Sequence, residues 1–459
     1  MTVQTSNFQP GSVAIIGGGL TGLSLAFRLQ QKGIPFLLFE KDDRLGGVIN
    51  TIRKAGFQYE EGPNTGVLST TETVELFEDI GCPTEIANPA AANRWILKKG
   101  EWVALPAGFW AGVTTPLFSF KDKLRLLGEP FRKKGRNPKE TLAELVVRRM
   151  GKSFLDYAVD PFISGIYAGD PNQLITKYAL PKLYQLEQGY GSFIKGAIKK
   201  SKLPKTALEK KANKAVFSAK GGLGSLIESI TSKLDQEALY TGSEVRHISK
   251  TSNGFSLKIK QGDRYKFFEA ERVVTSSGGS YLKNLFDFIQ PQLFTDIVNL
   301  RYAKVIQIAV GFNHWKGTKL NAFGGLIPEK ENRDILGVLF PASIFPGRAP
   351  EGGALMSVFM GGIKKPDLYD KTDEELKAIA LKALRELFHD ETLSPDLFEL
   401  FRYQQAIPQY DSSSEARLAA ISAIEENHPG VFLAGNIRDG IGMADRIKQA
   451  YHLAEILSK

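Results

Sequence analysis

The sequence contains a single cysteine among its 459 residues, so no disulfide can form within the chain. This scarcity indicates a reducing compartment, and we predict that Cys82, just after an expected helix, is a buried core residue. The five histidines are scattered without the short paired spacing of a metal-binding motif, so we expect no metal site. No serine lies in a G-x-S-x-G pattern, and nothing therefore suggests a serine hydrolase.

Long apolar segments are also missing. No run approaches the roughly 18 consecutive apolar residues of a membrane-spanning helix. The polar N-terminus has neither the basic start nor the apolar stretch of a secretory signal. We therefore expect a cytoplasmic protein without a transmembrane segment.

Acidic residues are fewer than basic ones, and the formal net charge of +9 favours an anionic partner. Residues 121–139 interleave lysines and arginines with leucines and Phe131, a pattern typical of a helix lying in a membrane interface. This stretch predicts peripheral contact with an anionic membrane, on the inner face of the cell membrane, although such charge is more often a solvated surface. Residues 199–214 lack aromatic side chains and resemble a solvated linker. No nucleic-acid-binding module accompanies the charge, so we expect no nucleic-acid partner.

The beginning of the chain reads as strand, glycine loop, helix and strand. The apolar segment Val13 to Ile16 leads into Gly17-Gly18-Gly19-Leu20-Thr21-Gly22, which fits G-x-G-x-x-G, and a helix follows to Gln31. In this motif the glycines permit a tight turn, a close approach to a pyrophosphate and close helix packing. The phosphates then meet the positive end of the helix. Glu40 closes the second strand, roughly 20 residues further on, where its carboxylate can bind ribose hydroxyls. The segment predicts a dinucleotide site.

Two further glycine-rich segments favour FAD over NAD as the dinucleotide. Arg44-Leu45-Gly46-Gly47 follows Glu40 at once, and a glycine pair at this place lets the backbone run beside an extended FAD. Near the C-terminus a short strand leads into Gly435-Asn436 and then Gly440-Ile441-Gly442-Met443-Ala444. This second strand-to-helix turn is suited to closing over a flavin with backbone donors and a helix N-terminus.

The chain is too long for one compact core, so two or three domains are expected. Nucleotide-binding elements at both ends, with different material between them, indicate a discontinuous domain. We predict an α/β fold in which a discontinuous Rossmann-type FAD-binding domain is joined by a β-rich substrate-binding domain and a helical, membrane-facing subdomain. The predicted segments are 1–88, 206–285 and 406–459 for the FAD-binding domain, 89–205 for the helical basic subdomain and 286–405 for the substrate-binding domain.

Motifs along nearly the whole chain resemble a known family. The glycine loop, residues 56–65 and the C-terminal turn are similar to the flavin-dependent amine oxidase superfamily. Within it, residues 161–171, Leu186-Glu187-Gln188, Gly222-Leu223 and residues 406–410 resemble the oxygen-dependent protoporphyrinogen oxidases. The resemblance implies FAD as cofactor, a porphyrinogen as substrate and dioxygen as acceptor. The implied reaction removes six electrons from protoporphyrinogen IX in three steps and gives hydrogen peroxide.

The resemblance also assigns cofactor-binding residues. Glu40 and Lys41 would bind the ribose and pyrophosphate together with the glycine loop, and Val245 would contact the adenine through its backbone. The residues implied beside the flavin are Gly62, Pro63, Asn64, Thr65, Gly435, Ile441, Gly442 and Met443. Asn64 is the position implied to assist the chemistry. Tyr403 stands where the family often carries a tryptophan near the flavin.

For the substrate, the resemblance implies that Arg94 pairs with a propionate carboxylate. A guanidinium fork suits that task because it binds a carboxylate bidentately. Apolar walls for the tetrapyrrole would come from Leu326, Leu339 and Phe359, with Ala168 and Gly169 beside them. By default each apolar residue would simply be core, and Asn64 would simply stabilise a turn after Pro63.

Several functions stay open on the sequence alone. The same oxidation of coproporphyrinogen III, which has four propionates, is the closest alternative. A polyamine or carotenoid oxidase on the same fold is more distant. An alternative of another class is a flavin-free escort protein of the GDP-dissociation-inhibitor kind. The oligomeric state is also open, a homodimer included.

Overall fold

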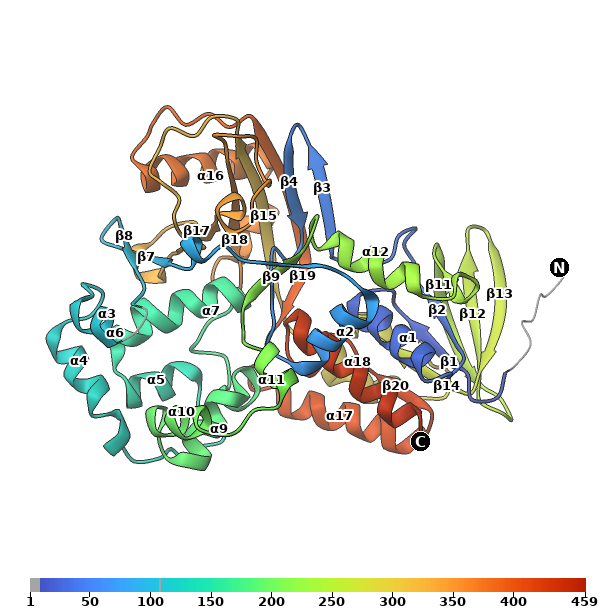
Figure 1. Ribbon diagram of the computed structural model, residues 1–459. Coiled ribbons are helices and arrows are strands. Elements are labelled where there is room, and N and C mark those ends of the chain that lie inside the picture. Colours follow the sequence, from blue (N-terminus) through green and yellow to red (C-terminus); the bar gives the residue numbers. More distant parts are fainter. Residues whose placement is uncertain (1–8, 107–108) are drawn as a thin grey trace.

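The computed structural model describes residues 9–106 and 109–459 (Figure 1). A parallel sheet of five strands binds the two ends of the chain together, in the order β10-β2-β1-β14-β20. Its strands are β1 (Val13–Ile16), β2 (Phe36–Phe39), β10 (Leu239–Tyr240), β14 (Arg272–Thr275) and β20 (Val431–Leu433). Because these strands come from three distant parts of the sequence, the predicted discontinuous Rossmann-type domain is confirmed. The exact segment boundaries remain a prediction.

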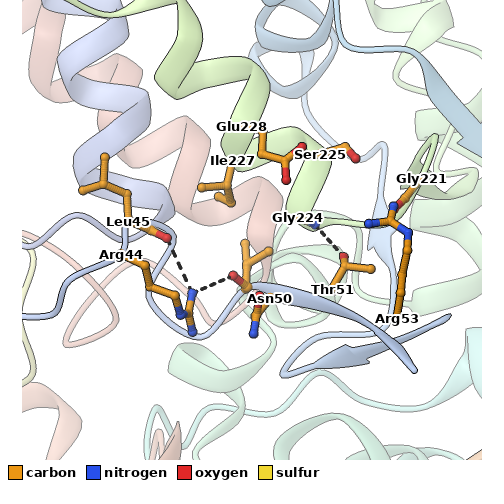
Figure 2. Close-up of a pocket in the computed structure, with 11 residues that line it drawn as sticks. Arg44, Leu45, Asn50, Thr51, Arg53, Gly221, Gly224, Ser225, Ile227 and Glu228 are labelled. Atoms are coloured by element: carbon orange, nitrogen blue, oxygen red, sulfur yellow. Dashed lines mark hydrogen bonds between the residues drawn. The ribbon is translucent and has the colours of Figure 1, made fainter. Parts of the chain in front are cut away.

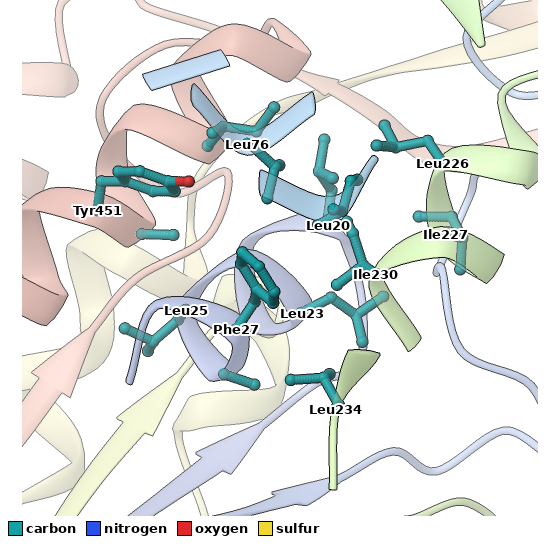
Figure 3. Close-up of a cluster of buried hydrophobic side chains, with 14 of the residues drawn as sticks. Leu20, Leu23, Leu25, Phe27, Leu76, Leu226, Ile227, Ile230, Leu234 and Tyr451 are labelled. Atoms are coloured by element: carbon teal, nitrogen blue, oxygen red, sulfur yellow. The ribbon is translucent and has the colours of Figure 1, made fainter. Parts of the chain in front are cut away.

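Helices cover one face of this parallel sheet. They are α1 (Leu20–Gln31), α2 (Thr71–Ile80), α12 (Gly224–Lys233) and α18 (Met443–Leu457). The apolar side chains between them form one core cluster, which also holds Cys82 as predicted. Figure 3 shows part of this cluster, including Leu20, Leu23, Leu25, Phe27, Leu76, Leu226, Ile227, Ile230, Leu234 and Tyr451. Burial of each such aliphatic side chain contributes roughly 1.5–3 kcal/mol, so the cluster fixes α1 and α18 side by side behind the glycine loop.

The opposite face of the parallel sheet is covered by a small antiparallel sheet and by α17 (Ser414–Asn427). The small sheet contains β11 (Ser243–Lys250), β12 (Phe255–Gln261) and β13 (Arg264–Ala270). In most of β12 and at the end of β13 every second residue is buried, as in a sheet with one face on the core.

A seven-stranded mixed sheet forms the second unit, in the order β19-β15-β18-β17-β16-β7-β8 (Figure 1). Its strands are β7 (Arg94–Lys98), β8 (Glu101–Ala104), β15 (Tyr302–Phe312), β16 (Gly324–Leu326), β17 (Ile335–Leu339), β18 (Ala354–Gly361) and β19 (Leu397–Pro408). Helix α16 (Asp373–Phe388) buries its apolar side against one face. Strands β7 and β8 fall in the segment that was predicted to be helical, and they add two strands to this sheet.

Short helices form the third unit, at the left of Figure 1. They include α4 (Phe120–Leu127), α5 (Leu142–Arg149), α7 (Asp160–Tyr167), α9 (Pro181–Tyr190) and α10 (Phe193–Ser201). At its centre Arg149 is fully buried and donates to carboxylate oxygens of Glu129 (2.6 Å) and Glu187 (2.7 Å). This network explains the glutamate of the Leu186-Glu187-Gln188 motif. Among the residues that the structure describes, no helix is long and apolar enough to cross a membrane.

Candidate active site

The predicted dinucleotide loop lies between β1 and α1, as its pattern requires. A Cβ atom added at Gly22 would lie 2.0 Å from the carbonyl oxygen of Gly17, so close helix packing excludes any side chain there. At Gly19 a Cβ would meet nothing within 4 Å, which leaves an open space above the start of α1. The backbone N–H groups at this helix N-terminus have the arrangement that binds phosphate. The loop therefore fits the pyrophosphate of FAD.

Glu40 and the second glycine pair lie directly against this loop. The buried carboxylate of Glu40 accepts hydrogen bonds from the N–H groups of Gly18 (2.6 Å) and Asp42 (3.0 Å). The N–H of Gly46 donates to the carbonyl of Gly18 at 2.8 Å. Lys41 follows Glu40 on the exposed side of the turn. The two glycine segments thus form one continuous backbone surface.

Arg44 occupies a different environment from the glycine loops. Its guanidinium donates to the carbonyl of Ile49 at 3.2 Å and stabilises the turn that carries Gly46 and Gly47. Figure 2 shows it at one side of a cavity of about 110 Å³, with Arg53 at the other side. Residues from the start of α12 line the cavity as well. A cofactor contact of Arg44 remains a prediction.

The adenine-side residue Val245 is placed by the strand that follows Glu40. The N–H of Ser243, at the start of β11, donates to the carbonyl of Glu40 at 2.7 Å. The carbonyl of Val245 accepts a hydrogen bond from the hydroxyl of Tyr281, and burial raises the pKa of that phenol. The backbone of Val245 is therefore fixed near the end of β2.

The segment Gly62-Pro63-Asn64-Thr65 follows β4 (Phe57–Glu61) and packs on the seven-stranded sheet. The side chain of Gln307 donates to the carbonyl of Glu60 at 2.8 Å and accepts from the N–H of Gly62 at 3.3 Å. Asn64 is 9% exposed, and its Oδ1 accepts a 2.8 Å hydrogen bond from the hydroxyl of Ser357. Sequence reasoning missed Gln307 and Ser357. Each is a polar residue inside an apolar strand, which is the signal that could have found them.

Tyr403, on β19, reaches the same segment. Its hydroxyl is buried beside the backbone of Gly62, and among the described residues it forms no well-aligned hydrogen bond. Burial, together with the charge of Glu61, raises the pKa of Tyr403 far above its ordinary value, so the phenol stays protonated. A neutral buried donor at this place fits a polar edge of the flavin.

The strand register places the predicted substrate residues on one face of the seven-stranded sheet. One row across the strands contains Arg94, Gly324, Leu339 and Ser357, and the next contains Ile96, Leu326, Gly337, Phe359 and Gln307. The two rows are two residues apart on each strand, so their side chains point to the same side. That side faces Asn64, because Ser357 and Gln307 bond the segment that carries it.

Helix α7 covers part of this face. A Cβ at Gly165 would lie 2.5 Å from Cδ2 of Leu326, so the helix approaches the sheet there without a side chain between them. The helix ends at Ala168, in the left-handed conformation, and the Ala168 side chain packs in the same small cluster as Phe359. A side chain at Gly169 would collide with Gln409. Both residues are buried, and they shape the wall rather than offering polar contacts.

Arg94 lies at the edge of this face. Its side chain is exposed, and its guanidinium lies 5.2 Å from the ring centre of Phe323. In the part of the chain that the structure describes, Arg94 forms no salt bridge, so its fork of donors is available to an anion.

The C-terminal loop connects β20 to α18. The N–H of Gly435 donates to Gln449 at 2.8 Å, and the N–H of Gly440 donates to the hydroxyl of Tyr410 at 2.8 Å. Helix α18 begins at Met443, and the N–H of Gly442 just before it donates to the carboxylate of Asp445 at 3.0 Å. The first N–H groups of the helix have no backbone partner within it. This turn presents the positive end of a long helix, and the flavin contact of its residues remains a prediction.

Comparison with known proteins agrees with this arrangement. A family model described as flavin containing amine oxidoreductase matches residues 20–451. Protoporphyrinogen oxidase 2 of Arabidopsis thaliana is 29% identical, covering 97% of this chain and 93% of its own. Coproporphyrinogen III oxidase of Bacillus subtilis (strain 168) is 26% identical, covering 95% of this chain and 96% of its own.

A solved structure also matches the fold. It is a protein from Exiguobacterium sp. 255-15 assigned as a protoporphyrinogen oxidase, which superposes with a TM-score of 0.81 at 22% identity and covers 98% of this chain and 99% of its own. The resemblance found in the sequence is thus confirmed, as are FAD as the cofactor and the mixed α/β fold. With a family model that spans most of its length and an intact dinucleotide cradle, this chain belongs to the flavin containing amine oxidoreductases.

Proposed function

We propose that this protein oxidises protoporphyrinogen IX to protoporphyrin IX, with dioxygen as the final acceptor and hydrogen peroxide as the second product. An oxidoreductase of this family, with relatives named for protoporphyrinogen and for coproporphyrinogen, is the coarser conclusion that the comparisons support. The observation that carries the finer proposal is the shared sheet face. Arg94, Leu339, Leu326 and Phe359 lie on adjacent strands of that face, opposite Asn64.

In this proposal the chain binds and orients a large flat substrate. Arg94 pairs with a propionate through its guanidinium, and the apolar walls exclude water from the macrocycle. Asn64, fixed by Ser357, lies beside the carbon that loses hydride. Bound FAD supplies the two-electron acceptor, and dioxygen reoxidises it. Three such steps remove six electrons, and the displaced protons leave to solvent.

Oxidation of coproporphyrinogen III is the second candidate. The Bacillus subtilis relative carries that name at an identity close to that of the plant relative. The described sheet face is mainly apolar, with Arg94 as its cation at the edge. This composition favours the substrate with fewer carboxylates, since each unpaired carboxylate buried there would cost free energy.

A direct comparison of the two substrates tests this assignment. The purified protein, reconstituted with FAD, would be given each porphyrinogen in the presence of dioxygen, and porphyrin fluorescence would be followed. A higher kcat/KM for protoporphyrinogen IX is expected. A higher value for coproporphyrinogen III would transfer the protein to the second candidate, and no turnover of either would reject both.

The escort alternative predicts a protein without flavin. The open space at Gly19 and the family membership speak against it. The visible absorbance of the purified protein distinguishes the two alternatives, because a yellow protein contains flavin and supports the oxidase. A colourless protein that does not take up FAD would support the escort.

We further propose peripheral binding to an anionic membrane through helix α4 and the turn after it. Phe120 and Phe131 are 74% and 86% exposed, and Leu124 and Leu127 are exposed beside them. Lys195 lies over the ring of Phe131, so a cation lies against the apolar patch. This combination suits an interface in which apolar side chains enter the acyl region and lysines meet the headgroups.

Sedimentation with vesicles tests the membrane proposal. The protein should sediment with vesicles rich in anionic lipid at low salt and should not sediment with neutral vesicles. Phe131→Glu should weaken binding, whereas Leu293→Glu, at an exposed leucine elsewhere on the surface, should not. Equal loss in both variants, or no binding at low salt, would reject the proposal.

A further inference from the structure

Arg446 is a buried cation directly after the loop that the sequence assigns to the flavin. It lies in the first turn of α18 and is 8% exposed. Its guanidinium donates to the carbonyls of Gly435, Arg438 (2.7 Å) and Gly440 (2.9 Å), three backbone groups of one loop. The charge is therefore held inside the turn between β20 and α18.

The charge of Arg446 is not neutralised by a direct ion pair. Its other contact is the amide oxygen of Gln449 at 3.3 Å, and none of the described carboxylates forms a salt bridge with it. Burial lowers the pKa of Arg446, while Tyr410 and Asp445 act in the opposite sense, and an arginine stays protonated through such changes. Within a poorly polarisable environment an unpaired charge acts over a longer distance than on the surface.

Arg438, in the same loop, provides the contrast. It donates twice to the carboxylate of Glu425, at 3.0 Å each, and is less buried. Its charge is compensated locally, so its field at the turn is weak. Arg438, in the loop, and Arg446, in the first turn of α18, are thus neighbours, and among the described residues only Arg438 forms a salt bridge.

The unpaired charge also coincides with the positive end of a helix. Helix α18 runs from Met443 to Leu457, and its first N–H groups lie at the Gly442 turn. A helix of this length carries about half a positive charge at its N-terminus. The Arg446 side chain and this helix end therefore both contribute positive potential where the sequence places the flavin, and the Asp445 carboxylate, which accepts from the Gly442 N–H at 3.0 Å, is the opposing charge.

We propose that Arg446 acts electrostatically on bound FAD and raises its reduction potential. Hydride acceptance leaves negative charge on the flavin ring system, and a nearby buried cation stabilises that charge. The role is one of positioning and charge, without contact to the substrate. The inference rests on the flavin contact proposed for Ile441 to Met443, and it is independent of which porphyrinogen is oxidised.

The test measures the midpoint potential of bound FAD by equilibration with a reference dye, without any porphyrinogen. Arg446→Met should lower the equilibrium constant for two-electron reduction at least tenfold, about 30 mV. In Arg446→Lys this equilibrium constant should stay within threefold of the value in the unsubstituted protein, because lysine keeps the charge. Arg438→Met is the matched control, and its equilibrium constant should also stay within threefold of the value in the unsubstituted protein.

Two results would overturn the inference. One is an equilibrium constant for FAD reduction in Arg446→Met that lies within threefold of the value in the unsubstituted protein. The other is an Arg446→Lys protein that shifts as far as Arg446→Met, since geometry rather than charge would then be responsible. If Arg446→Met does not retain FAD, the Arg446→Lys protein is the test. A change of its reduction equilibrium constant under threefold supports a role of the charge, and a larger change rejects it. The potentials are measured without porphyrinogen. A protein that does not oxidise porphyrinogens would therefore count against the proposed function and not against this inference.

Discussion

Ser357 donates a hydrogen bond to Oδ1 of Asn64 over 2.8 Å, joining the middle of strand β18 to the segment that follows β4. Both residues are buried, and the amide nitrogen of Asn64 lies 3.4 Å from the carbonyl of Gly62. One face of the asparagine side chain is therefore fixed by the sheet that also carries the proposed substrate walls. This contact connects the flavin side of the site to the substrate side.

Removal of that hydroxyl should reduce turnover. Ser357→Ala deletes one buried hydrogen bond and leaves an acceptor without its donor, a cost of about 1–3 kcal/mol. We expect kcat to fall roughly five- to thirtyfold, with KM changed less, while Ser357→Thr retains most activity because it keeps the hydroxyl. Steady-state kinetics on FAD-loaded protein measures this split. Equal kcat for Ser357→Ala and the unsubstituted protein would remove the contact from the mechanism.

Arg94 should act on substrate binding alone. Arg94→Ala removes a charged hydrogen bond of about 1.5–3 kcal/mol, so KM should rise on the order of 10- to 150-fold while FAD content stays the same. Arg94→Lys should recover only part of the loss, because an ammonium cannot form the bidentate pair. Arg264→Ala, at an exposed arginine of β13, is the control and should leave KM unchanged. An unaltered KM in Arg94→Ala would exclude Arg94 from the site.

Local patterns predicted the parts of the fold that rest on short-range rules. The glycine loop, with a strand before it and a helix after it, depends on neighbours in sequence, and the structure has this arrangement. Strand β7 was assigned to the helical region because its pairing with β16 joins residues far apart in the chain. Long-range register of this kind leaves no periodic signal in either strand alone.

Only the site residues that lie in sequence motifs could be predicted. Gln307 and Ser357 were missed because a polar residue in an apolar strand does not reveal what it bonds. Arg446 was also not identified from the sequence. Its burial and its three carbonyl partners depend on the path of the loop, which the sequence does not state.

Two glycines of the dinucleotide loop should respond differently to alanine. At Gly22 the added Cβ would meet the carbonyl oxygen of Gly17 at 2.0 Å, and backbone cannot rotate away as a side chain can. Gly22→Ala should therefore lower the free energy of unfolding by about 1–3 kcal/mol or more and abolish FAD retention.

At Gly19 the added Cβ meets nothing, and its φ of −74° suits any residue. Gly19→Ala should keep the stability of the protein without FAD within about 0.5 kcal/mol, while FAD affinity falls because the pyrophosphate loses its close approach. Thermal unfolding with and without FAD, together with FAD titration, separates the two effects. Wild-type FAD affinity in Gly19→Ala would contradict the placement of the pyrophosphate.

The buried charges of the helical unit should make its stability depend on pH. Burial raises the pKa of Glu129, but hydrogen bonds from Ser192 and the Phe193 N–H and the charge of Arg149 outweigh it, so the pKa of Glu129 is lowered. The pKa of Glu187 is lowered in the same way, with Arg148 as its main partner. A carboxyl whose pKa is lower in the folded state stabilises it above the unfolded pKa of about 4.3. That stability is lost as pH falls through the folded pKa.

Arg149→Met should break this network and also reduce its pH dependence. Removal of one partner of a buried ion pair costs about 3–5 kcal/mol because the other charge stays buried. The control is Lys152→Met, which removes the exposed partner of Asp156 and should cost about 1 kcal/mol or less. Denaturant unfolding of both variants between neutral and acidic pH measures the difference. We expect the loss in Arg149→Met to shrink as pH falls toward the carboxyl pKa values, because protonation weakens the same pairs in the unsubstituted protein. A loss that is equal at every pH, or equal in the two variants, would show that packing rather than charge stabilises the helical unit.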